Sequence, residues 1–346
     1  MSKVTTIAAV TQETASARPD RSTRRPVRER VAGAPISWGV CEVPGWGYQL
    51  GPDRVLSEMA GLGLPATELG PEGYLPTDAS RLEATLTDHG LGLVAGFVPA
   101  VLHEPDRLEG ELDRVRRQAD LLAAAGAEVL VLAAGTGRDG YEGGTDLDDP
   151  SWASLVAGIG RVIDLGSERG LAVALHPHQG TVIEGSPQVQ RLLESSPVSL
   201  CVDTGHLMVG GADPVELTTA ARDRVTHVHL KYVRADLAEQ VRTGRMGYRD
   251  AVAGGMYRPL GSGDVDVAAI VSALEASDYD GWYVLEQDTV LEGAPEEGSG
   301  PVQDVAVSLR FFERFGERLG SSSAAGVWVS ERGHAMGRHP GGKEGE

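Results

Sequence analysis

Histidines and carboxylates cluster on four apolar runs in the second half of the chain. The runs are residues 171–184, 198–207, 225–234 and 281–288. Because alternate residues of a strand face the same side, we expect His176 and His178 to point one way together, and likewise His227 and His229. Strands that converge with such groups at their carboxyl ends predict a metal cage built by a parallel barrel.

The residue types in this cage indicate which metals it would hold. Asp203 stands at the end of an apolar run, where a buried carboxylate is costly unless it is paired or binds a metal. His229 and Glu286 end the next two runs. Together with His176 or His178 they form a mixed nitrogen and oxygen shell, which suits Mn²⁺, Co²⁺, Fe²⁺ or Mg²⁺ better than structural Zn²⁺. The alternative is a polar barrel end linked by salt bridges.

Such a site predicts chemistry on a polyol. A divalent cation can bind a ketone oxygen and a neighbouring hydroxyl together and stabilise an enediolate. A base must then remove the α-proton, and an acid must return a proton or protonate a leaving hydroxyl. His206, Lys231 and Glu184 lie close to the expected ligands in sequence and are the candidates for these roles.

Lys231 has two interpretations. It shares a strand face with His227 and His229, and a neighbouring cation should lower its pKa enough for it to serve as a base. Alternatively, Lys231 pairs with Glu286 or Asp288 as an ordinary ion pair.

Alternating strand and helix signals predict the elements that position these residues. Expected strands precede the four ligand-bearing runs at 31–38, 66–70, 91–101 and 128–134, and helices are expected at 54–62, 79–89, 105–125, 151–169, 187–195, 212–222, 264–276 and 302–318. Eight strand–helix units over this length predict an α/β fold, a closed (β/α)₈ TIM barrel. A doubly wound sheet fits less well, because no glycine-rich phosphate fingerprint follows the first strand.

Composition bounds the class of protein. The net charge of −19 disfavours a nucleic-acid partner, because an acidic surface repels phosphate. No apolar run reaches the length of about 20 residues that spans a bilayer. Two distant cysteines indicate a reducing, cytoplasmic setting. We expect disordered tails at 1–30 and 320–346 around one catalytic domain at 31–319.

The motifs resemble a known family. Residues 203–206 (DTGH), 227–231 (HVHLK) and 286–288 (EQD) are similar to the xylose-isomerase-like TIM-barrel superfamily, which includes sugar isomerases, keto-sugar epimerases, endonuclease IV and inosose dehydratases. Inosose (2-keto-myo-inositol) dehydratases are the closest match, through residues 34–38 (APISW), 66–70 (ATELG), 176–181 (HPHQGT) and 261–266 (GSGDVD). The resemblance covers about residues 31–318.

The resemblance implies a role for each matching residue. The metal would be held by His176, Asp203, His229 and Glu286, with His178 as the alternative first ligand, since many relatives carry Glu there. His206 matches a substrate-contacting histidine, and Lys231 matches a lysine of the dehydratase branch. The residues expected to contact substrate are Trp38, Glu68, His178, His227 and Arg234.

These features predict a metal-dependent lyase that removes water from a keto-inositol or keto-sugar, with Mn²⁺ or Co²⁺ as cofactor. The alternative is an isomerase or epimerase on a keto-sugar, because Tyr232 stands where the family pattern has an acid and the loop 39–47 carries Glu42 alone. A DNA-repair endonuclease conflicts with the negative charge, and a non-catalytic sugar-binding barrel conflicts with intact ligands at four strand ends. The expected partners are a small polyol or keto-sugar and further copies of the chain.

Overall fold

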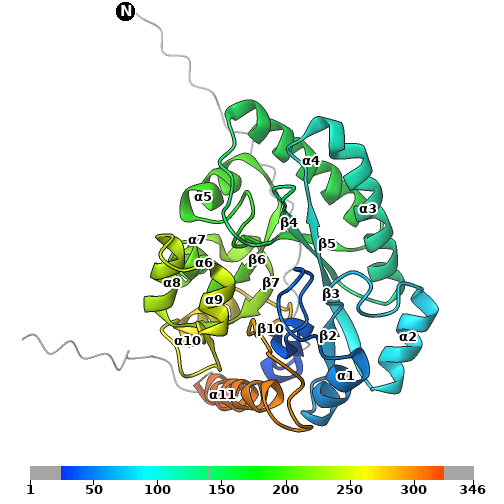
Figure 1. The fold of residues 1–346 in the computed structure, drawn as a ribbon, viewed down its shortest axis with the longest axis vertical. Helices are drawn as coiled ribbons and strands as arrows, with labels where there is room; N and C mark the ends of the chain where they lie inside the picture. Colours follow the sequence, from blue (N-terminus) through cyan, green and yellow to red (C-terminus); the bar gives the residue numbers. More distant parts are fainter. Residues whose placement is uncertain (1–24, 139, 323–346) are drawn as a thin grey trace, which may run out of the picture.

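The protein folds as a closed barrel of eight parallel strands ringed by helices (Figure 1). The computed structural model describes residues 25–138 and 140–322. The strands close in the order β1-β10-β7-β6-β5-β4-β3-β2, so that each strand pairs in parallel with both neighbours. The predicted TIM barrel is confirmed.

The eight barrel strands coincide with the eight predicted runs. They are β1 (Val31–Gly33), β2 (Ala66–Glu68), β3 (Gly92–Ala100), β4 (Val129–Ala134), β5 (Ala172–Leu175), β6 (Ser199–Asp203), β7 (Val225–Leu230) and β10 (Tyr283–Leu285). Every residue of β4 is buried, as expected for a strand covered on both faces. Several strands are shorter than predicted, and the run 171–184 leaves the sheet after Leu175.

The helices that follow the strands are marked in the sequence by their first residues. They are α1 (Pro52–Gly61), α2 (Ala79–Asp88), α3 (Pro105–Ala124), α4 (Asp149–Ser167), α5 (Ser186–Ser195), α7 (Pro214–Ala221), α10 (Val267–Ala276) and α11 (Pro301–Ser322). Proline opens α1, α3, α7 and α11, where its missing N–H costs nothing. Aspartate side chains cap α2, α4, α7 and α10 by accepting backbone N–H groups of the first turn.

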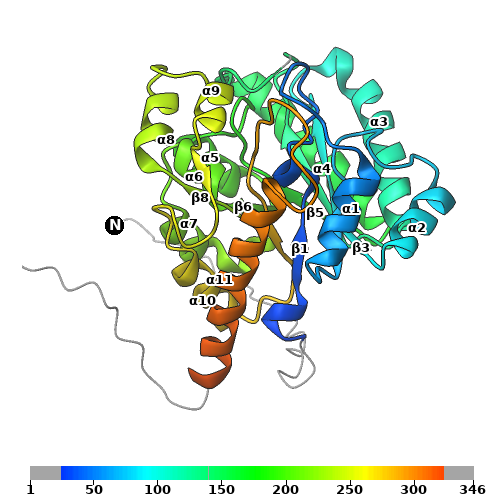
Figure 2. The same cartoon turned by 60° about the horizontal axis from the view of Figure 1, so that its bottom comes forward.

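The segment between β7 and α10 was not predicted. The run 225–234, predicted as one strand, ends as β7 at Leu230. The chain then forms β8 (Tyr232–Val233), α8 (Ala235–Arg242), α9 (Tyr248–Ala253) and β9 (Tyr257–Arg258), with β8 and β9 antiparallel. Figure 2 shows α8 and α9 at the end of the barrel toward which the strands run. A short helix, α6 (Thr204–Val209), also follows β6 directly. These elements add walls to the carboxyl-terminal mouth.

The amino-terminal end of the barrel begins earlier than predicted. Arg30 is completely buried and donates hydrogen bonds to the carbonyl oxygens of Tyr279 and Gly281 and to Glu275. Removing one partner of a buried ion pair typically costs about 3–5 kcal/mol. Arg30 is therefore part of the folded domain and not of a disordered tail. The rest of the predicted tails, residues 1–24 and 323–346, lies outside the described residues. No helix in the described ranges is long and apolar enough to cross a membrane.

Candidate active site

Side chains from four consecutive positions around the barrel meet at its carboxyl-terminal end. His176 follows β5, Asp203 ends β6, His229 lies in β7 and Glu286 follows β10. His176 Nε2 lies 3.3 Å from Asp203 Oδ2, and His229 Nδ1 lies 3.5 Å from the same oxygen. His229 Nδ1 also lies 2.9 Å from Glu286 Oε2. The structure therefore brings the four predicted ligands together.

The facing atoms of these four residues lack hydrogen bonds. His176 Nε2, Asp203 Oδ2, His229 Nδ1 and Glu286 Oε2 are buried and make no hydrogen bond to any described residue. A buried polar atom left in this way costs about 1–3 kcal/mol. Ligand atoms of Asp203, His229 and Glu286 lie within 4.8 Å of one another. Two imidazole nitrogens and two carboxylate oxygens are donor types that fit a divalent cation, and the two oxygens here also face the Lys231 ammonium.

Local structure aims the Asp203 carboxylate. Its Oδ1 accepts the backbone N–H groups of Gly205 and His206, both at 2.8 Å, and so caps α6. Its Oδ2 is left to face His176 and His229. Burial opposes the charge of this group, but the Lys231 ammonium outweighs it and holds the pKa of Asp203 well below its usual range. Asp203 is therefore a carboxylate with one oxygen committed to the fold and a second that faces His176, His229 and the Lys231 ammonium.

Glu68, at the end of β2, orients the histidines of β7. Its Oε1 accepts from His227 Nε2 at 2.7 Å and from His229 Nε2 at 2.9 Å. Because Nε2 of His229 is occupied in this way, Nδ1 is the nitrogen that faces Asp203 and Glu286. A carboxylate behind a metal-binding histidine commonly fixes its tautomer. Burial opposes ionisation, yet His229 and His227 lower the pKa of Glu68. Glu68, which also holds His227, thus fixes the orientation in which His229 faces Asp203 and Glu286.

Lys231 lies among three carboxylates. Its Nζ is 3.1 Å from Asp203 Oδ2, 3.0 Å from Glu286 Oε2 and 2.7 Å from Asp288 Oδ1. Burial favours the neutral amine, but the three carboxylates together raise the pKa of Lys231 well above its ordinary value. The sequence predicts a lowered pKa only with a cation beside Lys231, and that stays a prediction; the alternative ion pairs with Glu286 and Asp288 are both present in the structure. Lys231 is therefore a cation.

Three histidines line one side of the cluster as neutral rings. Burial lowers the pKa of His176 to about 3 and lowers the pKa values of His178 and His206 as well. His178 Nδ1 lies 2.8 Å from the carbonyl oxygen of Gln179, so this nitrogen donates and Nε2 carries the lone pair. The His178 and His206 rings lie 3.8 Å apart. Of the two candidates for first ligand, His176 therefore faces the cluster, whereas His178 faces the cavity and its neighbouring rings.

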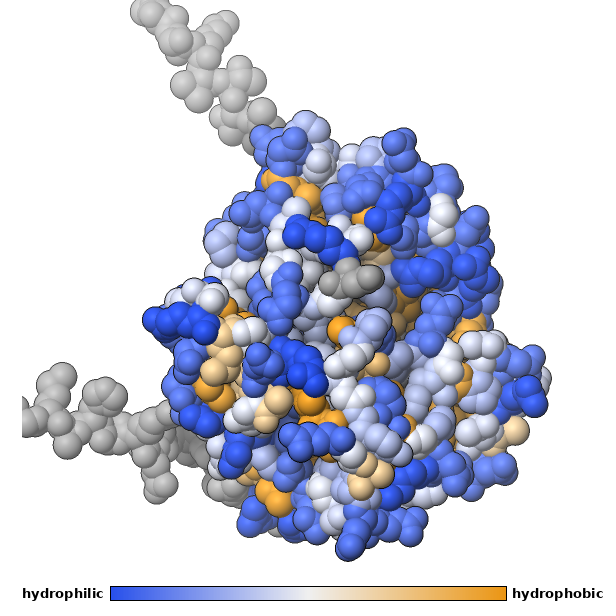
Figure 3. All heavy atoms as spheres, viewed as in Figure 1, coloured by the Kyte–Doolittle hydropathy of each residue, from blue (hydrophilic) through white to orange (hydrophobic). Residues whose placement is uncertain are grey.

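A partly open cavity of about 50 Å³ adjoins the cluster. Glu68, His176, His178, Lys231, Glu286 and Asp288 contribute to its walls. The roof consists of Glu42, from the loop after β1, and Tyr141, from the loop after β4. The Tyr141 hydroxyl donates to Glu42, and the Tyr141 ring lies 4.6 Å from the ring of His178. Hydrophilic residues cover most of this face of the molecule (Figure 3).

Comparison with known proteins identifies the family. The family model described as a xylose isomerase-like TIM barrel matches residues 56–313. The chain belongs to this family. It is 37% identical over 270 residues to an inosose dehydratase of Geobacillus kaustophilus, a match that covers 75% of this chain and 87% of that protein. It is 32% identical over 267 residues to the rhizopine catabolism protein MocC of Rhizobium meliloti, covering 75% and 81%.

A solved structure of the same fold is a D-allulose 3-epimerase from Methylomonas sp., with a TM-score of 0.61 and 18% identity, covering 84% of this chain and 99% of that one. This likeness shows the barrel fold alone, and the family rests on the family model and on the inosose dehydratase match. The resemblance inferred from the sequence motifs is thus confirmed.

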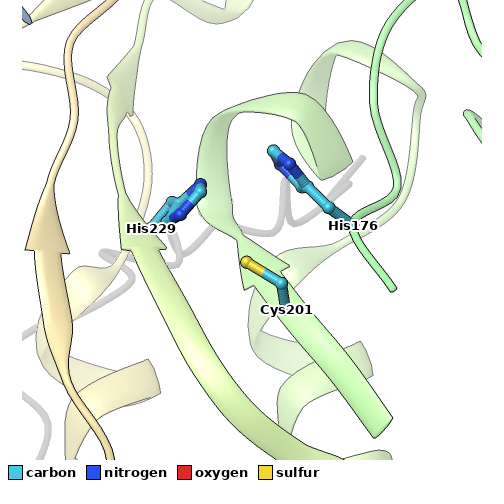
Figure 4. Close-up of side chains that lie close together, drawn as sticks. All are labelled: His176, Cys201 and His229. Atoms are coloured by element: carbon cyan, nitrogen blue, oxygen red, sulfur yellow. The ribbon is translucent and has the colours of Figure 1, made fainter. Parts of the chain in front are cut away.

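Cys201 lies in strand β6, beside His176 and His229. Figure 4 shows its sulfur pointing toward the space between His176 and His229. One ligand atom from each of these three residues lies within 4.8 Å of the others, which makes them a second possible metal-binding group. Burial raises the pKa of the Cys201 thiol to about 11. The sulfur is therefore protonated at neutral pH, and the carboxylates remain the better partners for a cation.

Three predicted site residues lie elsewhere. Trp38 is fully buried and donates its indole N–H to Glu58 at 2.7 Å, on the helix side of the strand, so it does not wall the cavity. Arg234 is half exposed and pairs with Asp236 at 2.7 Å. The chain has already turned away from the barrel axis at these positions.

Glu184 also lies apart from the cluster. It accepts the backbone N–H of Gly180 at 3.1 Å and lines a separate surface pocket of about 610 Å³. Its burial raises its pKa. Nearness to His176 and His178 in sequence did not bring it to the cavity, because the chain leaves the sheet after Leu175 and turns before reaching it.

Several residues of the site were missed. Asp288 had been considered only as a partner for Lys231, Tyr141 lies in a loop, and Tyr248 lies in the unpredicted helix α9. Only Asp288 carried a sequence signal, because it follows Glu286 by two residues at a strand end.

Proposed function

We propose that this protein is a divalent-metal-dependent dehydratase that removes water from an inosose or a related keto-polyol. The observation that carries the proposal is the set of four buried ligand atoms on His176, Asp203, His229 and Glu286, which face one another without hydrogen bonds and whose two oxygens are paired with the Lys231 ammonium. The identity to an inosose dehydratase over most of both chains supports the substrate class.

The ligand set supports Mn²⁺ or Co²⁺ as the cofactor. Two imidazole nitrogens and two carboxylate oxygens suit these ions, while Mg²⁺ prefers oxygen alone and structural Zn²⁺ prefers thiolates. When bound, such a cation supplies Lewis-acid stabilisation of an enediolate.

The remaining side chains divide into proton acceptors and a proton donor. His178 presents the Nε2 lone pair to the cavity, and its Gln179 contact holds this tautomer, so it can take the α-proton of a substrate. The His206 ring lies beside the His178 ring and is also neutral, because burial lowers the pKa of His206. Lys231, held as a cation, can donate a hydrogen bond to an oxygen that gains negative charge or to a departing hydroxyl.

The small, partly covered cavity supports elimination. Dehydration through an enediolate requires a site from which bulk water is excluded, because water would return a proton to the intermediate. The cavity has a volume of about 50 Å³, and Tyr141 with Glu42 covers part of its mouth.

The test is conversion of scyllo-inosose in the presence of Mn²⁺ or Co²⁺, followed by the ultraviolet absorbance of the enone product. Asp203→Asn is compared with Asp213→Asn. Both aspartates cap a helix by accepting two backbone N–H groups, but only Asp203 faces the cluster. We expect Asp203→Asn to lose at least about 100-fold in kcat/KM, the scale of a lost electrostatic catalytic group, and Asp213→Asn to keep its activity.

Unchanged turnover by Asp203→Asn would remove this residue from the site. Solvent deuterium incorporation into a keto-sugar without loss of water would favour the isomerase or epimerase instead.

A further inference from the structure

Asp288 is a third carboxylate beside Lys231, and the predicted ligand set does not use it. It lies two residues beyond Glu286 and is 5% exposed. Its Oδ1 lies 2.7 Å from Lys231 Nζ, and its Oδ2 accepts a hydrogen bond from the Tyr248 hydroxyl at 2.6 Å. Asp288 is absent from every group of described residues whose ligand atoms could share a cation. Its contacts point to a different task.

The Lys231 ammonium and a bound divalent cation would compete for the same carboxylate oxygens. Its ammonium lies 3.1 Å from Asp203 Oδ2 and 3.0 Å from Glu286 Oε2, the two carboxylate atoms that face the cluster. Two like charges cannot share these oxygens cheaply in a buried site, where charges are weakly screened. A divalent cation at Asp203 and Glu286 therefore requires Lys231 to have another anion within reach.

Packing limits where the ammonium can go. A Cβ atom on Gly205 would lie 2.8 Å from Lys231 Cβ, so the lysine stem is pressed against the α6 backbone. The Tyr257 ring lies 5.2 Å from the ammonium on another side. With its stem held, Lys231 can pivot among the three carboxylates around it, and Asp288 is the one that belongs to none of the possible ligand groups among the described residues.

We propose that Asp288, oriented by Tyr248, is the counter-ion that draws Lys231 away from Asp203 and Glu286 and thereby sets the affinity of the site for a divalent cation. The inference rests on the metal ligands of the proposed function, but not on its substrate. Tyr248 acts here as a positioning residue, because its hydroxyl touches Asp288 and reaches the ligand atoms only through it.

The insertion between β7 and α10 supplies the parts that hold Asp288. Tyr248 stands at the start of α9 and Tyr257 in β9, and their hydroxyl oxygens lie 3.0 Å apart. Both side chains are buried. This gives the unpredicted β8–β9 pair and the helices between its strands a function: they fix the carboxylate that faces the lysine.

The test measures Co²⁺ affinity by titration, using calorimetry and the visible absorbance of the bound ion. Tyr248→Phe removes only the hydroxyl that fixes Asp288. Tyr283→Phe is the matched control, because it also removes a buried hydroxyl that donates to a carboxylate, Glu275, but near the opposite end of the barrel. We expect Tyr248→Phe to weaken Co²⁺ binding about 10-fold, as for other residues that support metal ligands, and Tyr283→Phe to leave it within about twofold.

A double-mutant cycle tests the route through Lys231. Asp288→Asn removes a negative charge and weakens Co²⁺ binding directly, so it is measured both alone and together with Lys231→Met. We expect Asp288→Asn to weaken Co²⁺ binding about 10-fold more when Lys231 is present than when it is replaced by Met. Lys231→Met alone should tighten binding, because the competing ammonium is gone. Thermal unfolding without metal confirms that each variant is folded.

The outcomes separate the two proposals. If the wild type binds no divalent cation, the proposed function fails and this inference fails with it. If the wild type binds Co²⁺ but Tyr248→Phe behaves like Tyr283→Phe, or if Asp288→Asn costs the same in both backgrounds, the proposed metal site survives and the role of Asp288 is refuted.

Discussion

Asp203 joins two functions that substitution can separate, namely capping α6 and facing the ligand cluster. In Asp203→Asn the amide oxygen must take the place of Oδ1, because the N–H groups of Gly205 and His206 need an acceptor. The amide NH₂ then occupies the place of Oδ2, 3.1 Å from the Lys231 ammonium. This variant keeps the cap but presents a donor where a cation needs an anionic ligand. Asp203→Ala loses both.

The magnitudes follow from linkage. A cation present at 100 times its dissociation constant stabilises the wild type by about 2.7 kcal/mol. For a domain of this size, each kcal/mol raises Tm by about 2–4 °C, so Mn²⁺ should raise Tm by about 5–10 °C. We expect this increase to vanish in Asp203→Asn and in Asp203→Ala. Without metal, Asp203→Ala should be less stable than Asp203→Asn by about 1 kcal/mol, the cost of a lost cap.

The assay is thermal unfolding with excess EDTA and with excess Mn²⁺. Asp213→Asn and Asp213→Ala provide the matched pair, since Asp213 caps α7 in the same way. They should show the same difference in the absence of metal and the full increase in Tm with Mn²⁺. A full metal-dependent increase in Asp203→Asn would refute the placement of the cation at Asp203 Oδ2.

Other expectations test the supporting residues. Glu68→Gln should weaken divalent-cation binding about 10–100-fold, because the carboxylate that fixes His227 and His229 is lost; calorimetric titration showing wild-type affinity would contradict this. Metal-free protein should lose stability below about pH 6.5 by about 1.4 kcal/mol per pH unit for His176 alone, because the unfolded chain binds a proton that the folded His176, with a pKa of about 3, does not. The lowered pKa values of His178, His206 and His227 act in the same direction and the raised pKa of His229 opposes them, so urea unfolding at pH 7 and pH 5 in EDTA should show the fall, and His176→Gln should reduce it. Arg30→Ala should cost about 3–5 kcal/mol without changing cation affinity, because a buried ion pair with Glu275 is broken at the far end of the barrel; denaturant unfolding within 1 kcal/mol of the wild type would show that Arg30 contributes little.

The predicted site residues that lie away from the cluster were misplaced for one physical reason. Glu184 and Arg234 were chosen because they follow strands that carry ligands, and Trp38 because it ends the first strand at the same mouth, yet each lies beyond the point where the chain leaves the sheet. A strand carries its side chains in a fixed alternation, so His227 and His229 could be placed from spacing alone. A loop has no such period, and its direction depends on contacts with distant segments. The same reason hid Tyr141 and Tyr248.

The order of apolar runs and their turn and cap residues was enough to predict the barrel. In a parallel barrel every strand ends at the same mouth, so polar residues at the ends of β6, β7 and β10 had to meet there whatever the loops did. The sequence alone therefore determined that Asp203, His229 and Glu286 share one site. Only the tertiary structure decided which nitrogen of His229 faces them, that Lys231 is held as a cation among three carboxylates, and that Tyr248 orients Asp288. Those outcomes depend on distances between groups far apart in the chain, and charges interact according to such distances and not according to separation in sequence.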